Sequence, residues 1–188
     1  MLQVDSLWLP QLQQRNYRHL LNAMSRPGTQ NEILHGVPDQ YKPTYGFLPL
    51  LATLTDSQVS ISDPEFLLKE SDWKMLQASN TEVIKANFIV ATGERAIDEG
   101  PKLGSLANPE DSATLIICVS KIGEGDQALQ LTGPGVNGSA KVQICGLSES
   151  WLERRSEWCS SFPIGVDILL CDRDSFIALP RTTRVEVI

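Results

Sequence analysis

Five short apolar segments in the second half of the chain constrain the fold more than any other feature of the sequence. Each is four to six residues long, and turn-forming residues separate them, as is typical of strands. A compact apolar run at 87–91 precedes them. The predicted strands lie at residues 114–119, 129–132, 142–147, 168–171 and 176–179.

Four helices are predicted from apolar residues at helical spacing and from residues that start helices. Asp63 and Pro64 suit the N-cap and first position of one helix, and Pro49 must either lie in the first turn of another or bend it. The helices are expected at residues 10–25, 47–54, 64–78 and 150–158, with a short strand at 59–62. The apolar face of the first helix is expected to contain Tyr17, Leu20, Leu21 and Met24. This mixture indicates the α/β class with a mixed sheet.

Length and composition suit a single globular domain over residues 1–188, because 41% of the residues are hydrophobic. The net charge is −7 and the longest basic run is Arg154-Arg155, which argues against a sequence-independent nucleic-acid binder. No apolar run approaches the roughly 18 residues of a membrane span, and the first residues lack the features of a signal peptide. We therefore expect a soluble, cytoplasmic protein whose four cysteines are reduced.

Residue types that carry catalysis are few or stand in structural contexts. His19 and His35 are expected at the surface, and no nucleophile or metal-binding motif surrounds them. The pair Glu110-Asp111 has the chemistry of an acid–base pair in a cleft, but a turn before a strand is the simpler interpretation. Asp172 and Asp174 are expected in a solvated turn between two strands. The sequence therefore predicts no metal site, no cofactor and no catalytic set.

Two stretches are candidates for contact with an anion or a partner. Gly133 and Gly135 have backbone N–H groups that suit a phosphate, although the surrounding residues match no phosphate-binding motif and a turn between strands explains them. Arg181, Thr182 and Thr183 offer a guanidinium and two hydroxyls to a phosphate or carboxylate. In an extended strand these three side chains would alternate between two faces, which favours a sheet edge or a partner surface instead.

Four motifs, in order, together resemble one family. They are YRHLLNAMSRPG at 17–28, NPEDSATL at 108–115, LTGPG at 131–135, and FPIGVDIL at 162–169 with LPRTT at 179–183. Over essentially its whole length the chain resembles the PhnH subunit of the bacterial carbon–phosphorus lyase system.

The resemblance implies a fold, partners and a process. The family has an α/β/α sandwich similar to pyridoxal-phosphate-dependent transferases, but without that cofactor or its lysine. Members form homodimers and join the PhnG, PhnI and PhnJ subunits in a core complex. With these partners the family is implicated in moving the ribose triphosphate of ATP onto an alkylphosphonate, after which PhnJ breaks the carbon–phosphorus bond. The resemblance implies no catalytic residue for this subunit.

Three roles remain open on these grounds. The first is a structural or assembly subunit of the phosphonate-degrading complex. The second is a component that lends Arg181 and the loop at 133–135 to a shared active site. The third, a free-standing pyridoxal-phosphate enzyme, follows from fold analogy alone.

Overall fold

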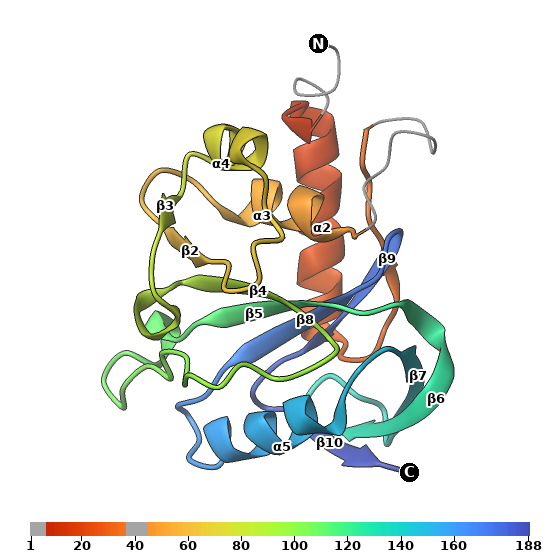
Figure 1. Ribbon diagram of the computed structural model, residues 1–188. Helices are drawn as coiled ribbons and strands as arrows, with labels where there is room; N and C mark the ends of the chain where they lie inside the picture. Colours follow the sequence, from red (N-terminus) through yellow and green to blue (C-terminus); the bar gives the residue numbers. More distant parts are fainter. Residues whose placement is uncertain (1–6, 37–44) are drawn as a thin grey trace.

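A seven-stranded mixed sheet forms the centre of the computed structural model, which describes residues 7–36 and 45–188 (Figure 1). Its strand order is β1-β9-β8-β5-β4-β2-β3. Five neighbouring strands run parallel to one another: β8, β5, β4, β2 and β3. Strand β9 is antiparallel to both of its neighbours, β1 and β8. The mixed α/β class expected from the sequence is confirmed. The strand bounds are β1 Asn31–Glu32, β2 Ser60–Ser62, β3 Ser79–Asn80, β4 Phe88–Thr92, β5 Thr114–Cys118, β8 Asp167–Cys171 and β9 Ser175–Leu179.

Three helices cover one face of this sheet: α2 (Pro10–Ser25), α3 (Phe47–Leu54) and α4 (Glu70–Leu76) (Figure 1). The helices expected at 10–25 and 47–54 are confirmed, and Pro49 lies in the first turn of α3, where a missing N–H breaks no helical hydrogen bond. The core on this face includes Leu20, Leu50, Leu51, Ile61, Ile116 and Phe176.

The opposite face is covered by helix α5 (Glu149–Trp158) and by a small antiparallel sheet of order β10-β6-β7. Trp151 and Trp158 of α5 pack edge to face, with ring centroids 6.4 Å apart, in the core on this side. Leu115 and Ile117 of the middle strand, β5, face this core, whereas Ile116 faces the other one, so β5 is apolar on both faces. The bounds of the small sheet are β6 Lys121–Thr132, β7 Ala140–Cys145 and β10 Arg184–Val187.

The prediction of a helix that starts at Pro64 is wrong. The Asp63 carboxylate accepts hydrogen bonds from the backbone N–H groups of Leu67 (2.9 Å) and Leu68 (2.7 Å), which closes a turn instead of starting a helix. Phe66 in this turn has a φ of 55°, and helix α4 begins only at Glu70. The physical reason is that a short acidic side chain caps a turn as well as it caps a helix.

The expected apolar face of α2 is also partly wrong, because Tyr17 and Leu21 are 51% and 53% exposed. The buried face contains Asn16, Leu20 and Ala23. Asn16 is tolerated there since its amide exchanges two hydrogen bonds of 3.0 Å with the backbone of Leu34.

All five predicted strands are present, although the segment expected at 129–132 belongs to a strand of 12 residues, β6. The helix expected at 150–158 is α5. None of the described helices is both long enough and apolar enough to cross a membrane. The single domain over 1–188 and the likeness to pyridoxal-phosphate-dependent transferases stay predictions.

Candidate functional site

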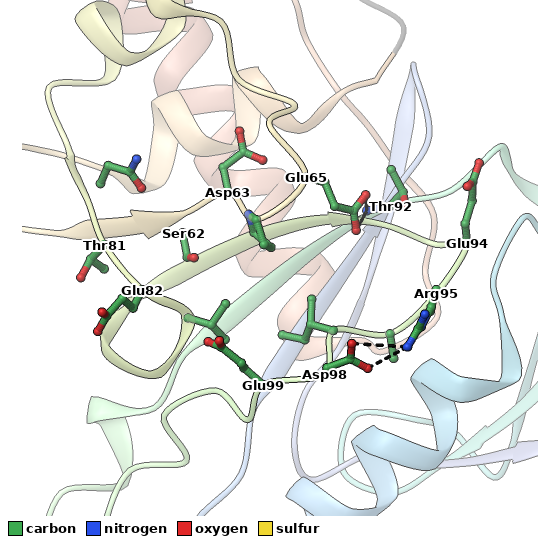
Figure 2. Close-up of a pocket in the computed structure, with 15 residues that line it drawn as sticks. Ser62, Asp63, Glu65, Thr81, Glu82, Thr92, Glu94, Arg95, Asp98 and Glu99 are labelled. Atoms are coloured by element: carbon green, nitrogen blue, oxygen red, sulfur yellow. Dashed lines mark hydrogen bonds and ion pairs between the residues drawn. The ribbon is translucent and has the colours of Figure 1, made fainter.

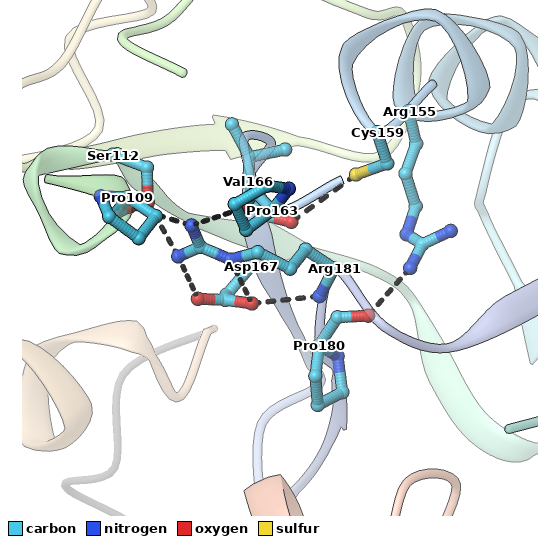
Figure 3. A network of polar contacts seen from close by, with 9 residues as sticks. All are labelled: Pro109, Ser112, Arg155, Cys159, Pro163, Val166, Asp167, Pro180 and Arg181. Atoms are coloured by element: carbon cyan, nitrogen blue, oxygen red, sulfur yellow. Dashed lines mark hydrogen bonds and ion pairs between the residues drawn. The ribbon is translucent and has the colours of Figure 1, made fainter. Parts of the chain in front are cut away.

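Arg181 lies at the amino end of the parallel strands and binds Asp167, the first residue of β8 (Figure 3). Its Nη2 is 2.7 Å from Asp167 Oδ2 and its Nε is 3.3 Å from Oδ1. Its backbone N–H donates to the same Oδ1 at 2.8 Å. Only 15% of the Arg181 side chain and 16% of the Asp167 side chain are exposed, so solvent screens this ion pair weakly.

The remaining N–H groups of Arg181 also donate to this chain (Figure 3). Nη1 lies 2.7 Å from the carbonyl oxygen of Pro109 and 3.5 Å from that of Pro163, and Nη2 lies 2.6 Å from Ser112 Oγ. A guanidinium has five N–H donors, and the five contacts here use them all. Arg181 therefore joins three motif segments, at 108–115, 162–169 and 179–183, within one network.

The chain bends at residues 180–183 and is not extended there. The N–H of Thr183 donates to the carbonyl oxygen of Pro180 at 2.9 Å, and β10 begins only at Arg184. Arg155 of α5 holds this turn, because its Nη2 donates to the carbonyl oxygens of Pro180 (2.7 Å) and Thr183 (2.8 Å).

Arg155, which holds the turn that contains Arg181, is a buried residue that sequence reasoning missed. It is buried, and burial lowers the pKa of its guanidinium below the ordinary value, although the nearby Cys159 and Asp167 oppose this shift. The available signal was its spacing, since Trp151, Arg155 and Trp158 recur at helical intervals and form the buried face of α5.

The glycine loop between β6 and β7 packs against two other motifs. A Cβ on Gly133 would lie 2.9 Å from the carbonyl oxygen of Thr182, and a Cβ on Gly135 would overlap the carbonyl oxygen of Ser25. Both glycines have positive φ values, 123° and 81°. The loop thus fills the space between the end of α2 and the turn at 180–183, which only residues without a side chain allow.

The structure therefore brings together most of the residues selected from the sequence, but it does not aim them at one point. Gly133 adjoins Thr182 and Thr183, whereas the Arg181 side chain turns toward Asp167. Thr182 is exposed and Thr183 is buried. Gly135 faces α2 instead.

A cleft of about 610 Å³ lies at the carboxyl ends of the parallel strands, where β2 and β4 end at Ser62 and Thr92 (Figure 2). The connection after β2 packs on one face of the sheet through Leu68, and the connection after β4 packs on the opposite face through Ile97. Ligands of α/β proteins bind where adjacent connections diverge in this way. A five-residue strand is roughly 15 Å long, so this cleft and Arg181 lie at opposite ends of the parallel strands.

The lining of the cleft is strongly acidic. Arg95, a basic residue of this lining, is paired with Asp98 at 3.0 Å. The Glu65 carboxylate accepts the N–H of Thr92 at 3.2 Å. Across the described ranges, no group of three or more His, Cys, Asp or Glu side chains is arranged to hold a metal ion. The acidic residues of the lining are Asp63, Glu65, Glu82, Glu94, Asp98 and Glu99.

Comparison with known proteins assigns the family. The family model of the bacterial phosphonate metabolism protein PhnH matches residues 7–186. The chain belongs to the PhnH family. It is 36% identical over 181 residues, or 96% of this chain and 89% of the relative, to the protein of Stutzerimonas stutzeri that carries the name C-P lyase subunit protein HtxG. It is 34% identical over 84 residues, or 45% of this chain and 42% of the relative, to alpha-D-ribose 1-methylphosphonate 5-triphosphate synthase subunit PhnH of Rhizobium meliloti.

The other candidate catalytic or metal-binding residues of this PhnH-family chain lie in structural contexts. His35 is buried, not at the surface, with Nε2 2.7 Å from the carbonyl oxygen of Arg173. Glu110-Asp111 forms a short 3₁₀ turn before β5, as predicted.

Asp172 is buried, so the prediction of a solvated turn there is wrong. Its carboxylate accepts the N–H groups of Ile122 (3.0 Å) and Ser175 (2.7 Å), which fastens the β8–β9 turn to β6.

Proposed function

We propose that this chain is an assembly subunit of a carbon–phosphorus lyase complex and supplies no catalytic group. With PhnG, PhnI and PhnJ partners it would support the transfer of ribose triphosphate from ATP to an alkylphosphonate, in the cytoplasm where ATP is available. The observation that carries this proposal is the use of every Arg181 donor by the chain itself. The names of the two relatives, one a C-P lyase subunit and the other a synthase subunit, support it.

The charge of the cleft supports the same proposal. ATP and phosphonates are anions, and a lining with six carboxylates and one arginine repels them. Neither the Arg181 network nor the cleft therefore favours direct binding of substrate.

The exposed apolar residues of α2 provide a surface for assembly. Tyr17 and Leu21 lie about one turn apart on α2 and are each more than half exposed, and so is Leu9 at the N-cap of the helix. Large apolar side chains gathered at a surface mark contacts between proteins. We assign this surface to the homodimer or to a partner subunit.

Co-expression tests the proposal. This chain is produced together with PhnG, PhnI and PhnJ, with one partner tagged, and the mass of the eluted material is measured by light scattering. We expect a stoichiometric assembly that contains the 20.8 kDa chain. A chain that elutes apart from all three partners overturns the proposal.

A second measurement separates an assembly role from a shared active site. Thr182 is the exposed hydroxyl of the candidate set, so Thr182→Ala removes this candidate hydroxyl without disturbing the core. We expect unchanged turnover per assembled complex. A loss of about tenfold or more with intact assembly would instead support donation of residues to a shared site.

A further inference from the structure

The cleft between β2 and β4 keeps unsatisfied negative charge. Glu94 and Glu99 are exposed, and within the described ranges neither has a hydrogen bond or ion pair. Glu82 is ionised beside Lys85, whose hydrogen bond and charge lower the Glu82 pKa, yet both side chains are 68% exposed. Such a pair holds its partners weakly and can exchange for another cation.

Two exposed apolar residues adjoin lining residues of this cleft along the chain. Phe66 directly follows Glu65 of the lining and is 89% exposed, and Ile84 directly follows Val83 and is 62% exposed. Apolar anchors beside a charged centre are typical of contacts between proteins, because the anchors exclude water around the charges. A free metal ion or a small anion would make no use of them.

We infer that this cleft docks a segment of a partner subunit that carries lysine or arginine side chains and at least one apolar side chain. The inference rests on the proposed function, since the partner belongs to the same complex. Charge complementarity selects the occupant: the lining has six acidic residues and one arginine, and that arginine already binds Asp98. Exposed charges of this kind act mainly by steering the encounter, so the association should depend on ionic strength.

Charge reversal at the two unpaired carboxylates tests the inference. The binding of Glu94→Lys/Glu99→Lys to an immobilised assembly of PhnG, PhnI and PhnJ is compared with wild type at low and high salt. The matched control is Glu124→Lys/Asp126→Lys, which makes the same change of charge at exposed residues of β6 away from the cleft.

We expect the cleft variant to bind about tenfold more weakly at low salt and to lose most of its salt dependence, while the control stays within about twofold of wild type. Glu94→Gln/Glu99→Gln should give an intermediate loss, and thermal unfolding of each variant verifies the fold. Phe66→Ser should weaken binding at both salt concentrations.

The outcomes separate this inference from the proposed function. Wild type that fails to bind the assembly overturns both. Wild type that binds, with cleft and control variants equal in affinity, overturns only the docking site. A Phe66→Ser variant of unchanged affinity overturns the protein segment as occupant.

Discussion

Asp167 binds three donors of Arg181: the backbone N–H and Nε through Oδ1, and Nη2 through Oδ2. Asp167 begins β8 and Arg181 follows the end of β9, so this one carboxylate closes the open end of the β8–β9 hairpin. The same guanidinium reaches Ser112 before β5. The pair therefore fixes where two parallel strands begin.

Replacement of Arg181 by alanine should lower the free energy of unfolding by about 3–5 kcal/mol, because the shielded Asp167 carboxylate loses its cation. Arg181→Lys keeps the charge but loses the planar fork, so it should cost on the order of 2 kcal/mol. Urea unfolding followed by tryptophan fluorescence measures both. Arg184→Ala is the control, since Arg184 is exposed, and it should change stability by less than about 0.5 kcal/mol. Arg181→Lys with the stability of wild type would show that the planar fork contributes nothing, and equal stabilities for the two variants would show that charge without the fork contributes nothing.

Gly135 and Gly138 provide a matched pair for the effect of close packing. Their φ values are similar, 81° and 73°, but a Cβ on Gly135 overlaps Ser25 whereas one on Gly138 meets nothing within 4 Å. Gly138→Ala should cost about 1 kcal/mol, from backbone strain alone. Gly135→Ala should cost about 2 kcal/mol more, because the end of α2 must move. Thermal unfolding of the two variants tests this, and similar melting temperatures would contradict the packing role of Gly135.

Thr183→Val should stabilise the protein. Thr183 is 2% exposed, and its Oγ1 has no hydrogen-bond partner among the described residues. A methyl group of the same shape removes that unsatisfied hydroxyl, so the free energy of unfolding should rise by about 1 kcal/mol. Thr182→Val at the exposed neighbour should stay within about 0.5 kcal/mol of wild type. Chemical denaturation measures both changes, and a loss of stability in Thr183→Val would reveal a partner for the hydroxyl.

Cys171 should make stability fall in alkaline solution. A hydrogen bond with Cys118 and burial raise the pKa of the Cys171 thiol well above its ordinary value. The folded protein thus keeps this proton where the unfolded chain loses it. The stabilisation is fully present below the ordinary cysteine pKa of about 8.5 and is lost above it, by up to about 1.4 kcal/mol per pH unit.

Urea unfolding between about pH 8 and pH 10 measures this slope. Cys171→Ala should have a shallower slope, whereas Cys145→Ala, at a half-buried thiol, should keep the slope of wild type. Equal slopes in wild type and Cys171→Ala would show that the thiol does not control the alkaline behaviour.

Several elements follow from local sequence. The five apolar segments formed strands because each is short and bounded by turns, and helices α2 and α3 formed where apolar residues recur at helical spacing. The same reasoning failed at Asp63, since its carboxylate closes a turn where a helix was expected. It also failed at Tyr17 and Leu21, because periodicity does not tell which side of a helix meets the core.

The sequence by itself determined the α/β class, most of the elements and the family motifs, because these depend on residues close together in the chain. Only the tertiary structure decided the role of Arg181, whose acceptors Asp167 and Pro109 lie 14 and 72 residues away. It also decided the acidic cleft, which three separate connections line without any shared motif. Hydrogen bonds and clefts of this kind depend on which strands become neighbours in the sheet, and strand order is a long-range property that no local pattern encodes.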